Sequence, residues 1–144
     1  MSKRQFASAA EAEAAFYEAL AQGDLDAVMG VWCTHEDVVC IHPGGARLDG
    51  YEVIREGWRL ILAQGKLRFR ITDVKAYEGM LFSVRTLCEW VADASNPDNE
   101  APVFATNTYL LTDHGWRMVA HHASAAPTAP ETESEGPVPG TLLH

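Results

Sequence analysis

The sequence lacks any apolar run close to the roughly 20 residues that a membrane-spanning helix needs. No apolar segment follows Lys3 and Arg4, so we expect no secretory signal. Basic residues are also scarce, because 11 Lys and Arg stand against 20 Asp and Glu, for a net charge of −9. This balance argues against nucleic acid, and against an anionic membrane surface, as a partner.

Cysteine is scarce as well, with three residues that share no metal-ligand spacing and lie among apolar neighbours. We interpret them as small buried side chains of a protein in the reducing cytoplasm. The densest set of ligand-type side chains, CTHED at positions 33–37, has no second cluster to complete a tetrahedral site. A glycine-rich phosphate loop and a G-x-S-x-G elbow are both missing. We therefore predict no metal and no cofactor.

Apolar side chains are plentiful, and at 47% of the chain they suffice for one core. Residues 1–126 are therefore predicted to form a single domain. Residues 127–144 are rich in proline and glutamate and poor in apolar side chains. Such a segment cannot bury enough surface to fold alone, so we interpret it as a tail.

The first half of the domain has helical periodicity. Ser8 and Glu11 fit a capping box for a helix that runs to Gln22, where Gly23 ends it. Asp24 can cap a second helix that continues to Trp32. A short β-rich run at 38–42 and a brief extended piece at 48–50 follow, and apolar spacing then predicts a third helix over 51–63.

The second half changes to strand periodicity. Four long strands are predicted at residues 66–78, 80–92, 102–112 and 115–125, joined mostly by short turns. Such connections are typical of an antiparallel meander. Helices followed by strands indicate an α+β fold with the helices packed on one face of the sheet.

Neither face of the predicted strand 80–92 has the polar character of a solvent face. Phe82, Val84 and Trp90 lie on one face, whereas Arg85 and Glu89 share the other with Leu87. An antiparallel sheet with one face in water alternates more cleanly than this. We therefore predict that one face covers the helices and that the other meets a second subunit in a homodimer.

Several short motifs occur in an order that resembles the nuclear transport factor 2-like superfamily, over roughly residues 6–126. They are FYEALAQGD at 16–24, VCIHPG at 39–44, GYEVI at 50–54 with Trp58, ATN at 105–107, and GWR at 115–117 leading to Ser124. This superfamily includes SnoaL-like and ketosteroid-isomerase-like proteins. The resemblance implies three helices packed on a strongly curved, mostly antiparallel sheet, a cone-shaped fold that encloses a pocket and dimerises through the sheet.

The resemblance to ketosteroid isomerases implies an acidic general base, and an oxyanion hole formed by a Tyr and a protonated Asp. No residues of this chain stand at positions that match these three. The last predicted strand is also similar to the association domain of calcium/calmodulin-dependent protein kinase II. The shared residues are Trp116, Val119, His122, Ser124 and Ala126-Pro127. Arg85 stands where one of that domain's pocket arginines lies, whereas Thr108 and Ala123 replace the other two. The arginine set that would bind a carboxylate is therefore incomplete.

Adjacent histidines in the last strand are candidate catalytic residues. Side chains alternate along a strand, so His121 and His122 point to opposite faces and cannot chelate as a pair. One is expected to enter the interior, as a catalytic, ligand-binding or structural histidine. Which one enters stays open, because a β-bulge would reverse the alternation.

Polar residues on otherwise apolar strands are the other candidates. On a buried face, Arg85 could bind an anion and Glu89 could act as a base with a raised pKa; alternatively, both are paired within the wall or across the dimer. Asn107 either orients a ligand carbonyl or ties neighbouring strands. His42, Trp32 and Trp58 are candidates for the pocket wall or mouth, with loop-pinning or core packing as the alternative.

Two functional hypotheses follow for this chain. The first is a cofactor-free isomerase or related proton-transfer enzyme, with Glu89 and one of His121 and His122 catalytic and a small apolar ligand. The second is a non-catalytic ligand-binding or oligomerisation module, for which a bound carboxylate at Arg85 would be the sign.

Overall fold

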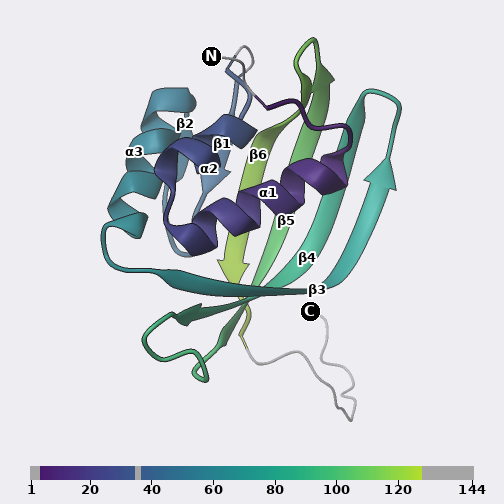
Figure 1. Ribbon diagram of the computed structural model, residues 1–144. Helices are drawn as coiled ribbons and strands as arrows, with labels where there is room; N and C mark the ends of the chain where they lie inside the picture. Colours follow the sequence, from purple (N-terminus) through teal and green to yellow (C-terminus); the bar gives the residue numbers. More distant parts are fainter. Residues whose placement is uncertain (1–3, 35–36, 128–144) are drawn as a thin grey trace.

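Three helices pack on the same side of one sheet (Figure 1). The computed structural model describes residues 4–34 and 37–127. Helix α1 spans Ala9–Gln22, α2 spans Leu25–Val31 and α3 spans Tyr51–Leu62. These bounds agree with the predicted helices to within one residue at the C-terminal ends.

Local side-chain contacts explain where α1 and α2 begin. The Ser8 hydroxyl accepts a hydrogen bond from the amide of Glu11, and Asp24 accepts one from the amide of Ala27. The carboxylate of Glu11 returns to the amide of Ala7, one residue before the position that a capping box predicts. Gly23 has a φ of 70°, the left-handed conformation that lets α1 stop and α2 start at once.

The sheet has six strands in the order β2-β1-β6-β5-β4-β3. Their bounds are β1 Val39–Ile41, β2 Arg47–Asp49, β3 Leu67–Glu78, β4 Phe82–Asp93, β5 Ala101–Thr112 and β6 Gly115–Ala125. β3 to β6 form the predicted antiparallel meander, and β1 pairs parallel to β6. Because β2 and β3 stand at the two edges, the sheet is open, and the expected α+β fold is confirmed.

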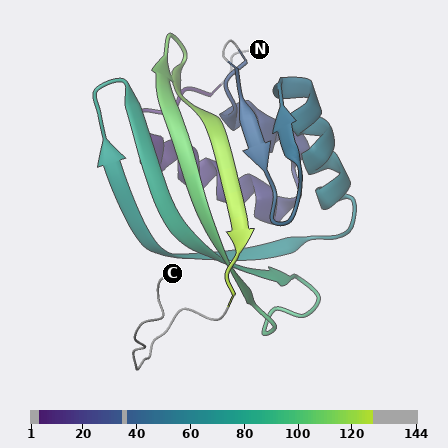
Figure 2. The same ribbon diagram turned by 180° about the vertical axis from the view of Figure 1, so that it is seen from behind.

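The two faces of the sheet have different surroundings. Arg85 and Glu89 of β4 contact α1, so the helices cover the face that carries them. The other face, seen in Figure 2, carries no helix. Phe82 and Phe104 lie on it and are 49% and 45% exposed. The prediction that one face covers the helices is therefore confirmed, whereas a second subunit on the other face remains a prediction.

A β-bulge bends the long strand β3. Its pairing with β4 shifts between Thr72 and Lys75, and Asp73 has a φ of 58°, which is rare for a residue other than glycine. Thr72 accepts a hydrogen bond from the indole of Trp90 on β4. In the view of Figure 1, β3 sweeps across one end of the helical layer.

Some predictions fall at the limits of the described residues. The tail at 127–144 lies outside them except for Pro127, and so do His35 and Glu36 of the 33–37 segment. Where the chain is described, no helix has both the length and the apolar character to cross a membrane. Cys33, Cys40 and Cys88 are free and buried, as predicted.

Candidate functional site

A connected set of polar side chains lies between α1 and the sheet, where apolar packing would be expected. Its members, here called the polar network, are Glu13, Tyr17, Arg85, Glu89, Asn107, Tyr109 and His121. Glu13 and Tyr17 are four residues apart on α1 and therefore share its buried face. The other members come from β4, β5 and β6, on the face that the helices cover.

Glu13 is the anionic centre of the polar network. Arg85 Nε donates to its Oε1 at 2.8 Å, while Asn107 Nδ2 and the Tyr109 hydroxyl donate to its Oε2 at 3.1 and 2.9 Å. A buried carboxylate is stable when a cation and several donors surround it in this way. Arg85 also contacts Glu78 at 3.4 Å, so the guanidinium is paired within the wall, one of the alternatives that the sequence leaves open.

Glu89 has a different environment from Glu13. Its Oε2 accepts a hydrogen bond of 2.6 Å from the Tyr17 hydroxyl, and no ion pair with Glu89 occurs among the described residues. Burial raises the pKa of Glu89 to about 7; the Tyr17 hydrogen bond acts in the opposite sense and the charge of Glu13 adds to the increase. The carboxyl group can therefore both give and take a proton near neutral pH.

His121 is the histidine that enters the interior. It is 2% exposed, and its Nδ1 lies 2.6 Å from Asn107 Oδ1. Burial lowers its pKa to about 3, and the nearby His42 and His122 act in the same sense. His122 lies on the exposed outer face, opposite Thr106. The predicted division of the pair between two faces is therefore confirmed, and within the described ranges the His122 side chain forms no hydrogen bond with the polar network.

Three aromatic rings lie near the imidazole of His121. Ring centroids of Phe16, Trp58 and His42 lie 5.4, 5.8 and 6.4 Å from that of His121. His42 meets Trp58 edge to face at 4.5 Å, and burial lowers the pKa of His42. Two of the predicted wall residues, His42 and Trp58, are thus brought together with His121.

Cys40 Sγ lies 3.7 Å from His42 Nε2 in the same region. Burial raises the pKa of the Cys40 thiol to about 12, and the charge of Glu89 adds to this. The thiol is therefore protonated at neutral pH, and a nucleophilic Cys–His pair is not formed here.

Trp32 has a different position from the other candidates. It is fully buried directly after α2 and forms an isolated bridge with Met118, within the apolar core. The structure describes no hydrogen bond or ring contact between Trp32 and the polar network. Its position is that of core packing, the alternative considered for it from the sequence.

Some buried polar atoms have no partner in the described part of the chain. They are Trp32 Nε1, Trp58 Nε1 and Ser83 Oγ. Trp58 is the one of these that adjoins His121 and His42, and its unpaired donor lies in an otherwise aromatic environment. This indole N–H is therefore a hydrogen-bond donor that no described side chain of the aromatic surroundings uses.

Three members of the polar network were not predicted from the sequence, namely Glu13, Tyr17 and Tyr109. Glu13 and Tyr17 lie within the buried face of α1, between Ala12 and Leu20. An acidic residue on an otherwise apolar helix face was the one sign in the sequence of a buried polar site. Their partners lie 72 to 96 positions away in the sequence, so no local spacing could connect them.

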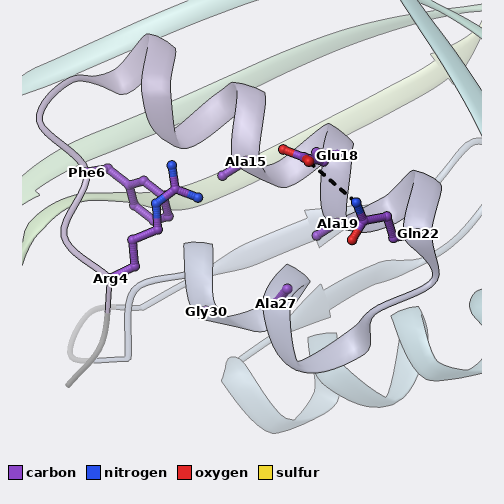
Figure 3. A pocket seen from close by; sticks show the side chains of 8 residues that line it. All are labelled: Arg4, Phe6, Ala15, Glu18, Ala19, Gln22, Ala27 and Gly30. Atoms are coloured by element: carbon purple, nitrogen blue, oxygen red, sulfur yellow. Dashed lines mark hydrogen bonds between the residues drawn. The ribbon is translucent and has the colours of Figure 1, made fainter. Parts of the chain in front are cut away.

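A cavity of about 380 Å³ lies elsewhere, between α1, α2 and the segment before α1 (Figure 3). Arg4 and Phe6 line one end, and Glu18 and Gln22 of α1 line the other, hydrogen-bonded to each other at 3.4 Å. Alanines and Gly30 complete its wall. It shares no lining residue with the polar network.

No cluster of three or more potential metal ligands occurs in the ranges 4–34 and 37–127.

Comparison with known proteins agrees with the fold and its order of elements. A solved structure from Thiobacillus denitrificans, proposed to be a calcium/calmodulin-dependent protein kinase type II association domain, is 34% identical, with a TM-score of 0.78 over 85% of this chain and 98% of that one. A structure from Streptomyces avermitilis, a proposed dehydratase of the NTF2-like family, is 30% identical, with a TM-score of 0.76 over 81% of this chain and 92% of that one.

A curated relative is similar over part of its length. The F-box protein SKIP8 of Arabidopsis thaliana is 27% identical over 113 residues, or 76% of this chain. This chain spans about half of that protein, namely 46%. The family model described as the SnoaL-like domain matches residues 10–129. The resemblance found in the sequence is therefore confirmed, and the chain belongs to the SnoaL-like family within the NTF2-like superfamily.

Proposed function

We propose that this protein catalyses proton transfer on a small, uncharged and largely apolar molecule, with Glu89 as the acid–base group. The observation that carries the proposal is the environment of Glu89, which is buried, hydrogen-bonded to Tyr17 and without an ion-pair partner among the described residues. A catalytic acid or base works best when its pKa lies near the working pH, and the pKa of Glu89 is raised to about 7.

The contrast between two buried carboxyl groups supports this assignment. Glu13 is held by Arg85 and by two further donors, and its charge is compensated. Glu89 has one donor, the Tyr17 hydroxyl, and its second oxygen has no hydrogen bond within the described ranges. Two carboxyl groups in such different environments are typical of a site where one is held in place by its partners and the other moves a proton.

The surroundings of the polar network support a small apolar ligand. Phe16 and Trp58 offer aromatic surface beside His121, and the unpaired indole N–H of Trp58 can donate to a ligand oxygen. His42 lies at the end of β1 and is only partly buried, so it is placed to line an entrance. Arg85 is occupied by Glu13 and Glu78, which disfavours an anionic ligand at that point.

Solvent hydrogen exchange into ketones tests the proposal without knowledge of the natural substrate. Cyclohexanone and acetophenone, incubated in deuterium oxide with the protein, are followed by proton NMR for loss of the signal next to the carbonyl. We expect the wild type to accelerate exchange. Glu89→Gln should reduce that acceleration by roughly 10²-fold or more, because the amide cannot accept the proton.

Glu18→Gln is the matched control, since it makes the same change at an exposed carboxylate of α1 outside the polar network. It should leave the exchange rate unchanged. Full activity in Glu89→Gln, or no acceleration of either ketone by the wild type, would argue against proton transfer at this site.

A second candidate function is a non-catalytic association module. It is favoured by the exposed aromatic side chains on the outer sheet face and by the 34% identity to the proposed association domain from Thiobacillus denitrificans. In either case we propose a homodimer formed through this face. A ligand that is bound and recovered unchanged would distinguish the association module from the enzyme.

A further inference from the structure

The side-chain amide of Asn107 connects the two halves of the polar network. Asn107 is fully buried, and its Nδ2 lies 3.1 Å from Glu13 Oε2 and 3.0 Å from the Tyr17 hydroxyl. Its Oδ1 lies 2.6 Å from His121 Nδ1. One amide thus contacts the anionic centre, the tyrosine that holds Glu89, and the buried histidine.

Glu13 fixes which way this amide points. As the carboxylate of an ion pair with Arg85, Glu13 can only accept hydrogen bonds. A reversed amide would place Oδ1 against Glu13 Oε2, with two acceptors in contact and no hydrogen between them. The Nδ2 group must therefore face Glu13, and Oδ1 must face His121.

The orientation of the amide in turn decides where the proton of His121 lies. Oδ1 accepts but cannot donate, so the nitrogen facing it, Nδ1, must carry the hydrogen. The ring is neutral at ordinary pH, because burial lowers the pKa of His121 to about 3. A neutral imidazole carries one hydrogen, which leaves Nε2 with a free lone pair.

We propose that Glu13 and Asn107 are positioning residues that hold His121 as the Nδ1–H tautomer and so keep its Nε2 available as a hydrogen-bond acceptor. No described residue forms a hydrogen bond with Nε2. The ring therefore meets a bound molecule as an acceptor, and it selects one that brings a hydroxyl or N–H group. Trp58 supplies the complementary donor from the same aromatic cluster.

This selection of ligands rests on the proposed function, since it requires that a ligand reach the interior beside His121. The tautomer does not depend on catalysis and can be measured on the protein alone. The two claims can therefore fail separately.

Long-range proton–nitrogen NMR of protein labelled with ¹⁵N-histidine distinguishes a protonated ring nitrogen from one with a free lone pair. The chain has six histidines, and the His121→Gln variant identifies the signals of position 121. We expect a single neutral form in the wild type at neutral pH, protonated at Nδ1 and unprotonated at Nε2.

Glu13→Gln tests the orienting role. The new amide can donate to Asn107 Oδ1, so the Asn107 amide is free to reverse, and we expect a second tautomer of His121 with its proton on Nε2. Glu78→Gln is the matched control, because Glu78 is the other carboxylate partner of Arg85 and has no contact with Asn107 in the described ranges. It should give the wild-type spectrum.

Asn107→Leu provides a second route if Glu13→Gln does not fold, because it removes the acceptor itself. It too should lose the uniform Nδ1–H form. A wild-type His121 protonated at Nε2 would overturn the proposal. So would a folded variant at position 13 or 107 that keeps the pure Nδ1–H form, or a Glu78→Gln spectrum that changes as much as that of Glu13→Gln. Absence of ketone exchange in the wild type would contradict the acid–base function and leave the tautomer assignment standing.

Discussion

Glu89 and His121 are buried groups whose pKa values are displaced in opposite directions, and each links stability to pH. Glu89 keeps its proton in the folded state between its ordinary value of 4.5 and about 7, where the unfolded chain has lost it. Stability therefore falls as the pH rises through this window. His121 stays neutral between 6.5 and about 3, where the unfolded chain gains a proton, so its contribution falls as the pH drops.

Glu89→Gln should separate these two effects. Glutamine stays neutral and still accepts the Tyr17 hydrogen bond, so the variant escapes the cost of a buried charge. We expect the variant to match the wild type near about pH 4 and to exceed it by up to about 3 kcal/mol near about pH 8. Urea unfolding at the two pH values measures this difference. A difference that is the same at both pH values would show that Glu89 ionises normally.

At the scale of single residues, strand alternation predicted which side chains share a face but not which face the helices cover. Arg85 and Glu89 were expected on one face, paired within the wall or across a dimer, and the structure places them and Asn107 under α1. What they bind could not be predicted. Tyr17 reaches Glu89 across 72 positions of the sequence, and such a contact depends on how α1 lies over the sheet.

Among the secondary-structure elements, β3 carries the strongest local irregularity. Asp73 adopts a φ of 58° at the bulge between Thr72 and Lys75. The left-handed conformation is accessible to glycine and tolerable for Asp or Asn, whereas a β-branched side chain is strongly disfavoured there. The bend of β3 therefore depends on the residue type at this position.

Asp73→Val should lower the free energy of unfolding by about 1–2 kcal/mol, whereas Asp73→Gly should cost little or nothing. Asp73→Asn is the matched control, because it keeps the size and the tolerance for this conformation. Urea unfolding of the three variants measures the differences. Equal stability of the Val and Gly variants would contradict the assignment of a strained bulge.

Irregularities of this kind also limited the sequence prediction. The last strand was predicted at its observed position, yet the inward histidine could not be chosen between His121 and His122. The structure has a register shift in the β5–β6 pairing between Thr108 and Tyr109. A shift of one position exchanges the two faces, and no residue pattern in the sequence marks it.

At the scale of the whole molecule, the outer sheet face is the main unexplained surface. Tyr77, Phe82 and Phe104 lie on it and are 60%, 49% and 45% exposed. Exposed aromatic side chains on a face that no helix covers are typical of a protein–protein contact. The proposed homodimer would bury them.

Light scattering after gel filtration should give the mass of a dimer for the wild type at micromolar concentration. Phe104→Glu places a charge on the proposed contact face and should shift the mass to that of a monomer. Leu60→Glu is the matched control, since Leu60 is 52% exposed on α3, away from the outer face. A monomeric wild type would contradict the proposal, as would a Phe104→Glu variant that stays dimeric.

The overall architecture was predictable because it depends on periodicity and chain order. Residues 9–62 carry three helical segments, with two short extended segments before the third, and four long strands follow. This order predicts an α+β fold with an antiparallel meander. The interior chemistry depends on contacts between α1 and three strands, which a one-dimensional pattern does not contain.

The central claim is that Glu89 titrates near neutral pH inside the polar network. Carbon NMR of the Glu89 side-chain carboxyl group, assigned with Glu89→Gln and followed against pH, measures this directly. The structure predicts a midpoint of about 7. A midpoint at or below the ordinary value of 4.5 would mean that Glu89 is a stable anion at neutral pH, and that it cannot act as the proton donor and acceptor proposed here.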